Sequence, residues 1–275
     1  MNGYPFRLGA TSYIIPAGML PNVRYLAGKV QDVELLLFEV DDGLNSLPGK
    51  EQIAELASIA RDHDLTYTVH LPLDLQLADD GSAGHASIET ARRVMDCTRD
   101  LDPWAYVLHL AGKSVRNDAT LRDVRLWQEQ AVQSLEIVGK WAGGLTKLAV
   151  ENLEGHPLNF YQKVLERIAV SRTVDVGHLW LDGYDPVLYL QNALPRTRVI
   201  HIHGIDGRDH KSLAHVPVEW LRAVLDELVR SDYRGVLTVE VFSEDDFLTS
   251  CAAMKAIMNT AISANPRQGE RDGMS

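Results

Sequence analysis

The segment at residues 199–213, V-I-H-I-H-G-I-D-G-R-D-H-K-S-L, is rich in residue types that bind metal ions. Its apolar start predicts a strand, on which His201 and His203, two positions apart, point to the same face. A loop rich in Gly and Asp follows and adds Asp209 and His210. Imidazoles and carboxylates gathered at a strand end are typical of a metal site. A pair of hydrogen-bonded histidines is the alternative unless other strands bring matching residues.

Matching residues do stand near the ends of almost all the other predicted strands. They are Glu39, His70, His109, Glu151, Asp175, His178 and Glu240. Each one alone is explained by an ion pair or a bond to the backbone, but together they are buried polar groups that need a common partner. One to three divalent cations would supply that partner. The donors are oxygen and nitrogen without thiolate, which favours Zn²⁺, with Mn²⁺ or Fe²⁺ as alternatives and Mg²⁺ less suited.

The elements that must position these residues recur regularly along the chain. Apolar runs predict eight strands at 7–15, 33–40, 65–71, 104–110, 147–152, 172–176, 198–203 and 235–242. Helix-periodic sequence separates them, at 51–63, 88–99, 124–140, 159–168, 186–192 and 218–230. This alternation predicts an α/β fold, a single (β/α)8 TIM barrel, in which the carboxyl ends of the strands form the active-site face. A doubly wound sheet is the alternative, but no G-x-G-x-x-G follows the first strand.

Length and composition agree with one catalytic domain. We expect the barrel to occupy residues 1–264 and the polar tail at 265–275 to be disordered. There is no apolar run of membrane-spanning length and no signal peptide, and the two cysteines fall in helix-like segments, so we expect reduced thiols and a cytoplasmic location. The net charge of −11 argues against a nucleic-acid partner and leaves a small-molecule substrate as the expected one.

Further side chains near the same strand ends are candidates for contact with a substrate. They are Thr11, Ser12, Tyr13, Glu39, Asp74, Trp180, Tyr184 and His203. Arg208 and Lys211 flank His210, where either could neutralise a phosphoryl oxygen. The alternatives are ordinary strand-end polarity, aromatic packing at the barrel rim and solvation of the two cations.

The order His70, His109, Glu151, Asp175-x-x-His178, His201, His210, Glu240 resembles the xylose isomerase-like barrel superfamily, especially its endonuclease-IV-type phosphodiesterases. The resemblance implies up to three zinc ions. Glu151 would bridge two of them, Asp175, His201 and Glu240 would be ligands, and the other four histidines would fill the remaining positions. The nucleases have Asp-x-His where this chain has Arg208-Asp209-His210. Adjacent side chains diverge unless the loop kinks, so a centre of one or two metals is the alternative.

Four segments resemble more closely the cobamide-remodelling phosphodiesterases of the CbiR family. These are T-S-Y-I-I-P-A-G-M-L-P-N-V at 11–23, D-V-E-L-L-L-F-E at 32–39, T-V-H-L-P-L-D-L at 68–75 and G-R-D-H-K-S-L at 207–213. The resemblance implies hydrolysis of the phosphoribosyl bond in the nucleotide loop of a cobamide, which releases a cobinamide-type corrinoid. Glu151 would hold the metals and orient the nucleophile, and Arg208 or Lys211 would stabilise charge on the phosphoryl group.

Two other functions remain open at this point. A single-metal sugar or keto-acid isomerase or epimerase needs only Glu151, Asp175, His201 and Glu240, with Glu151 and Glu240 moving a proton beside a carbonyl. A binding protein for a corrinoid or a sugar needs no catalysis at all. His70, His109 and His210 distinguish the first two, because a single-metal isomerase does not require them. The sequence leaves the oligomeric state open.

Overall fold

Eight parallel strands form a closed barrel in the computed structural model, which describes residues 4–37, 47–116 and 119–264. The strands are β1 (Arg7–Thr11), β2 (Asp32–Leu36), β3 (Thr66–Asp74), β4 (Tyr106–His109), β5 (Leu148–Glu151), β6 (Ser171–Asp175), β7 (Thr197–Ile202) and β8 (Val236–Val239). Each pairs with its neighbour in chain order, and β1 pairs with β8 to close the ring. The predicted (β/α)8 barrel is confirmed.

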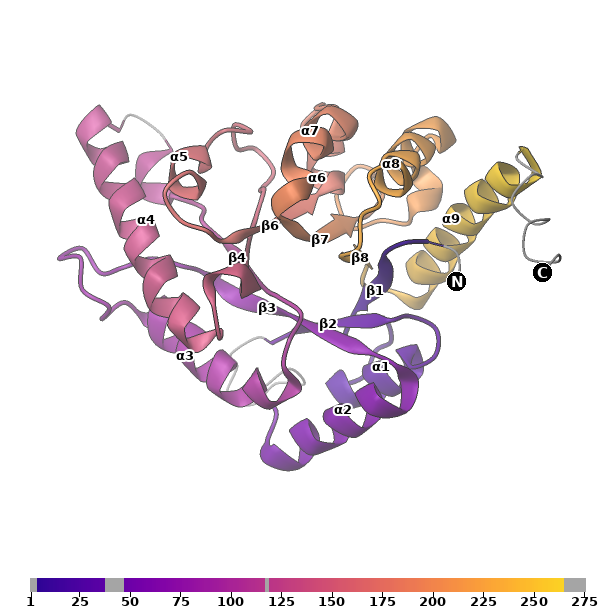
Figure 1. The fold of residues 1–275 in the computed structure, drawn as a ribbon, viewed down its shortest axis with the longest axis horizontal. Coiled ribbons are helices and arrows are strands. Elements are labelled where there is room, and N and C mark those ends of the chain that lie inside the picture. Colours follow the sequence, from indigo (N-terminus) through magenta and orange to yellow (C-terminus); the bar gives the residue numbers. More distant parts are fainter. Residues whose placement is uncertain (1–3, 38–46, 117–118, 265–275) are drawn as a thin grey trace, which may run out of the picture.

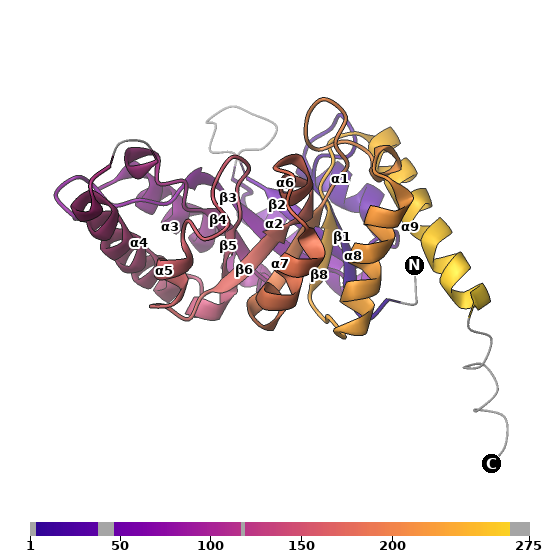
Figure 2. The same cartoon turned by 90° about the horizontal axis from the view of Figure 1, so that it is seen from above.

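Helices surround the strands on the outside (Figures 1 and 2). They are α1 (Met19–Leu26), α2 (Lys50–His63), α3 (Ala86–Thr98), α4 (Leu121–Trp141), α5 (Gln162–Leu165), α6 (Val176–Leu181), α7 (Pro186–Ala193), α8 (Val218–Arg230) and α9 (Glu244–Ala264). Short 3-10 turns lie at Arg99–Leu101, Lys113–Val115, Leu145–Lys147, Leu194–Arg196 and Leu213–His215. No helix within the described ranges is long and apolar enough to cross a bilayer.

The apolar core has two parts because strand side chains alternate between the two faces of the sheet. Outward-facing residues such as Tyr106 and Leu108 join the large cluster that packs against the helices. Their neighbours in sequence belong to a separate small cluster inside the barrel, which contains Val107, Ala149 and Val199. Inward-facing positions farther along the strands are polar, and these form the site described below.

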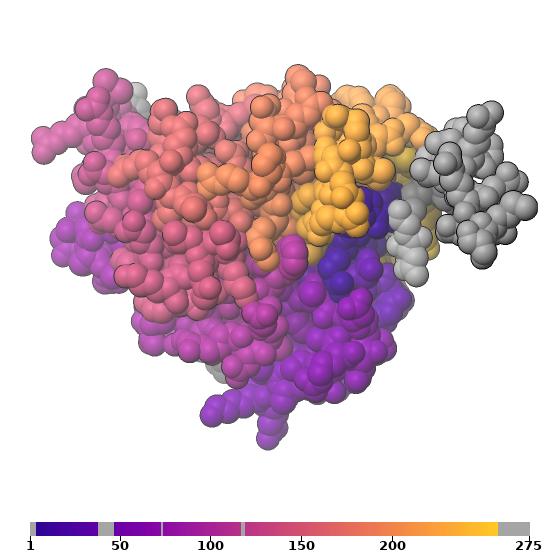
Figure 3. Space-filling view, in the orientation of Figure 1, coloured from indigo at the N-terminus to yellow at the C-terminus, as the bar shows by residue number. Residues whose placement is uncertain are grey.

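The N-terminal segment lies beside α9 on the barrel surface, where the hydroxyl of Tyr4 donates to the carbonyl oxygen of Met254 over 3.4 Å. In the space-filling view the N-terminal segment, in indigo, adjoins the C-terminal helices in orange and yellow (Figure 3). The hydroxyl of Tyr25 donates to Glu244 at the start of α9 over 2.8 Å. Residues 265–275 lie outside the described part of the chain, so the disordered tail stays a prediction.

Some elements differ from the sequence-based expectation. The first strand ends at Thr11 and not at residue 15, because the amide of Asn22 holds the following loop by accepting from Ile15 N and donating to Ala17 O. The helix predicted at 159–168 shrinks to α5, a single turn. The structure adds α1 and α6, and it extends the helix-like segment around Cys251 into α9.

A capping box begins α4. Thr120 Oγ1 accepts from Asp123 N, and the Asp123 carboxylate accepts from Thr120 N over 2.9 Å. We expect Thr120→Ala to lower the free energy of unfolding by about 1 kcal/mol, because one backbone donor loses its partner. Thr120→Ser keeps the oxygen and should retain most of that stability. Urea unfolding of both variants measures the difference, and equal stability of Thr120→Ala and wild type would contradict the assignment.

Candidate metal centre

The carboxyl ends of the strands bring carboxylates and imidazoles together inside the barrel mouth. The group comprises Glu34, His70, His109, Glu151, Asp175, His178, His201, His203, His210 and Glu240. Strand register accounts for part of this, because β6 and β7 pair Asp175 directly with His201. Three sets of these side chains offer ligand atoms that lie within 4.8 Å of one another.

Glu151 belongs to two of the three sets. Its Oε2 lies 3.3 Å from His70 Nε2 and 3.0 Å from His109 Nε2, while its Oε1 lies 3.1 Å from His201 Nδ1. The two carboxylate oxygens therefore face two different groups of imidazoles. This is the geometry of a carboxylate that can bridge two cations.

The central set consists of Glu151, Asp175, His201 and Glu240, all of them buried. His201 Nδ1 lies 3.2 Å from Glu240 Oε2 and 3.9 Å from Asp175 Oδ2, so one ring nitrogen faces all three carboxylates. Three carboxylates and one imidazole form a donor set that suits a divalent transition metal.

The third set consists of His178, His203 and His210. Asp175 connects it to the central set, because Asp175 Oδ1 lies 3.3 Å from His203 Nε2 and Asp175 Oδ2 lies 3.5 Å from His178 Nδ1. The sequence points to His203 as a substrate contact, whereas the structure places its ring beside those of His178 and His210.

The loop after β7 is kinked at His210, although Asp209 belongs to none of the three sets. His210 adopts a left-handed backbone with φ of 51°, an uncommon conformation for a residue other than glycine. Its amide donates to His203 Nδ1 over 3.0 Å, and its Nε2 lies 3.5 Å from Asp209 Oδ2. Gly204 allows the turn, since a Cβ there would lie 1.9 Å from the carbonyl oxygen of Ser212.

Electrostatics show how strongly this mouth attracts positive charge. Burial opposes the charge on His201, but the carboxylates around it, Glu240 and Glu34 foremost, hold the pKa of its imidazole well above the usual range. Burial would likewise raise the pKa of Glu151, but the charge of His201 and the bonds from neighbouring imidazoles hold it well below its usual value. Protons on imidazoles balance the carboxylates here, and bound cations would do the same.

Several buried oxygen and nitrogen atoms of the candidate ligands make no hydrogen bond to the described part of the chain, which also suits divalent cations. Asp175 Oδ2, His203 Nε2 and Glu240 Oε2 are buried and make no hydrogen bond within the described residues, although groups of opposite charge type lie 3.2 to 3.9 Å from them. Leaving buried polar atoms unsatisfied is costly, so such atoms are rare unless an ion or water completes them. Each of these residues belongs to one of the three sets, so the side chains present fit bound divalent cations.

The three residues that close the first strand lie among backbone and aromatic partners. Thr11 and Ser12 are buried; Thr11 Oγ1 donates to Val241 O, and Ser12 Oγ accepts from Leu36 N. The Tyr13 ring meets the edge of Phe242. The bonds of Thr11 and Ser12 join the end of β1 to Val241, just after β8, and to the end of β2.

The remaining sequence candidates lie around the rim. Asp74 ends β3 and accepts from Ala111 N over 2.7 Å. Trp180 is buried and packs near Trp220, whereas Tyr184 is exposed. Arg208 is exposed and Lys211 half-buried, both in the kinked loop that carries His210.

Glu39 lies outside the described residues, so its expected contact with substrate stays a prediction. β2 ends at Leu36, and its inward-facing acidic residues are Asp32 and Glu34. Glu34 Oε2 lies 2.8 Å from His201 Nε2. The sequence signal for this was the i, i+2 spacing of two acids in a strand that is otherwise apolar.

Asn152 is a second residue that the sequence does not single out. Its amide donates to Asp175 O and accepts from Asp175 N, so it ties the end of β5 to the end of β6. The Asp175 carboxylate in turn caps α6 by accepting from His178 N over 2.7 Å. Asp175 and His178 are thus held by local bonds before any metal binds.

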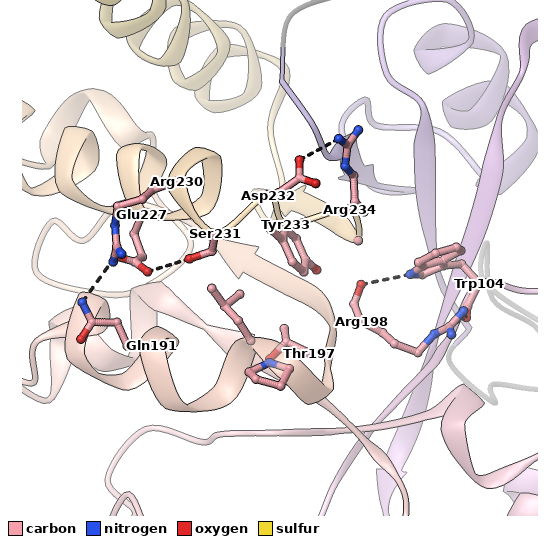
Figure 4. A pocket seen from close by; sticks show the side chains of 13 residues that line it. Trp104, Gln191, Thr197, Arg198, Glu227, Arg230, Ser231, Asp232, Tyr233 and Arg234 are labelled. Atoms are coloured by element: carbon pink, nitrogen blue, oxygen red, sulfur yellow. Dashed lines mark hydrogen bonds and ion pairs between the residues drawn. The ribbon is translucent and has the colours of Figure 1, made fainter.

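A cavity of about 800 Å³ lies at the opposite end of the barrel (Figure 4). Trp104 and Arg198 line it near the starts of β4 and β7, together with residues of the turn between α8 and β8. Arg198 lies over the Trp104 ring and donates to its carbonyl oxygen, and Arg234 pairs with Asp232. None of the candidate ligands lines this cavity, and this end of a barrel ordinarily serves stability.

Comparison with known proteins places this fold. The profile of the family described as xylose isomerase-like TIM barrel matches residues 29–263. A search of curated proteins gave no match.

Solved structures of similar fold include epimerases and a nuclease. A D-tagatose 3-epimerase-like protein has a TM-score of 0.71 at 17% identity, covering 94% of this chain and 99% of that chain. An L-ribulose 3-epimerase has a TM-score of 0.64 at 18% identity, covering 96% of this chain and 99% of that chain. Endonuclease IV from Thermus thermophilus has a TM-score of 0.65 at 16% identity, covering 92% of this chain and 99% of that chain. These likenesses concern the fold.

Stability of the metal-free protein should fall as the pH rises from about 6.5 to 9. Burial opposes the charge on His70, but its bond to Glu151 outweighs this and raises the pKa of His70 from 6.5 to about 9. A pKa raised in the folded state adds stability below pH 6.5 that is lost as the pH passes 9. The melting temperature, measured in the presence of a chelator between pH 6.5 and 9, tests this prediction. His70→Ala should flatten the slope, while His215→Ala, outside the three sets, should not; a melting temperature that rises over this window would contradict the prediction.

Gly177 leaves room for the ring of His203. A Cβ at Gly177 would lie 2.1 Å from His203 Cε1, so Gly177→Ala must displace the imidazole from the third set. We expect this variant to bind fewer equivalents of zinc than wild type and as few as His203→Ala. Metal analysis after dialysis measures the count, with circular dichroism as the control for folding. A count equal to that of wild type in both variants would remove the third set from the metal centre.

Proposed function

Because the chain belongs to the xylose isomerase-like TIM barrel family, we propose that it is a phosphodiesterase that uses more than one divalent cation. The observation that carries the proposal is the position of Glu151, whose two oxygens face His70 and His109 on one side and His201 on the other. An enzyme with one metal in the central set does not need the imidazoles of His70 and His109. Hydrolysis of a phosphodiester, by contrast, is helped by several cations that stabilise the charge on its oxygens.

In the proposed reaction water adds to phosphorus, one P–O ester bond breaks, and a phosphomonoester and an alcohol leave. A bound divalent cation would supply Lewis-acid stabilisation of the phosphoryl oxygens and lower the pKa of a coordinated water. Glu151 and Glu240 would orient the attacking water and hold its proton. Arg208 and Lys211, on the loop that carries His210, would bind the phosphoryl oxygens.

The proposed substrate is a cobamide, cut in its nucleotide loop to release a cobinamide-type corrinoid. The support is the resemblance of four segments to cobamide-remodelling phosphodiesterases of the CbiR family. Two of these segments carry residues of the metal centre: 68–75 contains His70, and 207–213 contains His210. The net charge of −11 argues against a nucleic-acid substrate.

A single-metal sugar epimerase is the second candidate. Epimerases stand among the structures most similar in fold, and the central set alone would hold one cation with carboxylates on either side of a substrate. Glu151 and Glu240 would then exchange a proton at the carbon next to a carbonyl.

Incubation with adenosylated and cyanated cobalamin tests the proposal. Zinc- or manganese-loaded protein should yield a corrinoid that lacks the lower base, identified by mass, and should contain more than one metal equivalent per chain. Glu151→Gln and His109→Ala should each lose at least about 100-fold in rate, because each removes a candidate ligand. His215→Ala is the matched control and should retain activity. Intact cobalamin, one metal equivalent and deuterium exchange into a ketohexose would instead identify the epimerase.

A further inference from the structure

Glu34 is a carboxylate in the barrel mouth that is not itself in any of the three sets of candidate ligands. Its side chain is fully buried on β2. Its Oε2 lies 2.8 Å from His201 Nε2, and its Oε1 has no hydrogen-bond partner within the described residues. A buried carboxylate that lacks a Lys or Arg partner is costly, so it needs a reason to be there.

The two nitrogens of His201 face opposite ways. Nδ1 lies 3.1 Å from Glu151 Oε1 and faces the central set, whereas the hydrogen-bond partner of Nε2 among the described residues is Glu34. A neutral imidazole has one N–H group and one lone pair. When Nε2–H donates to Glu34, the lone pair of Nδ1 must point to the place where the carboxylates converge.

We propose that Glu34 is a positioning residue that fixes the tautomer and the orientation of His201 for metal binding. A carboxylate behind a metal-ligating histidine also makes its imidazole more basic and so a stronger ligand. Glu34 would act through His201 and would touch neither metal nor substrate. The inference rests on the metal centre of the proposed function and is independent of the substrate.

Asp32 provides a matched control on the same strand. It lies two residues earlier on the same face and is equally buried. Its Oδ2 accepts from Thr66 Oγ1 over 2.6 Å, and no histidine pairs with it among the described residues. Asp32→Asn alters a buried carboxyl group on the same strand that makes no hydrogen bond or ion pair with His201 among the described residues.

The test compares zinc affinities of wild type, Glu34→Ala, Glu34→Gln and Asp32→Asn by competition with a chelator. We expect Glu34→Ala to weaken the tightest zinc site by about 10- to 100-fold. Glu34→Gln keeps an oxygen that can accept from Nε2 and should recover part of the loss, and Asp32→Asn should bind as wild type does. If Glu34→Ala fails to fold, Glu34→Gln, which is nearly the same size, should still bind zinc more weakly than wild type.

Substitution of cobalt for zinc adds a spectroscopic measurement. The visible absorption of cobalt should change in both Glu34 variants, because His201 is reoriented or less basic, and stay unchanged in Asp32→Asn. Equal affinity of wild type and both Glu34 variants, or an equal loss in Asp32→Asn, would overturn the inference and leave the proposed function intact. Wild type that binds no divalent metal would overturn the proposed function itself.

Discussion

Repulsion among buried carboxylates is the constraint on which the rest of this mouth depends. Glu34, Glu151, Asp175 and Glu240 converge from four strands, and each is nearly inaccessible to water. Four negative charges so close together cannot all persist without positive charge nearby. Imidazoles surround them at distances of 2.8 to 3.9 Å and have raised pKa values where shifts are resolved. The barrel thus holds an anionic ring whose natural complement is a set of cations.

The scaffold supports this ring with hydrogen bonds that involve the backbone. Asn152 joins the backbone of β5 to that of β6, and Asp175 caps α6 while also facing the central set. The left-handed backbone of His210 and the close approach at Gly204 turn the loop after β7 back over the mouth. Side chains held in this way lose little freedom when a ligand binds, which favours a preorganised centre.

Much of the site followed from residue type and periodicity. The strands were apparent because near-continuous apolar runs mark strands buried on both faces, and the rule that carboxyl ends meet at one face brought together residues from 70 to 240. Glu34 escaped because the second strand was predicted at 33–40, with Glu39 as its acidic end. That range left out Asp32, so the i, i+2 pair of Asp32 and Glu34 was not recognised. His203 was recognised but given another role, since alternation fixes a face and not a partner.

The sequence by itself determined the barrel and most of the acids and imidazoles at its mouth, because these depend on local pattern. Only the tertiary structure decided how the ligands divide into three sets, with Glu151 shared by two of them. It also decided that His201 turns one nitrogen to that centre and the other to Glu34. The physical reason is that such contacts join residues as many as 167 positions apart, and their distances depend on strand register and ring rotation, which no local pattern encodes.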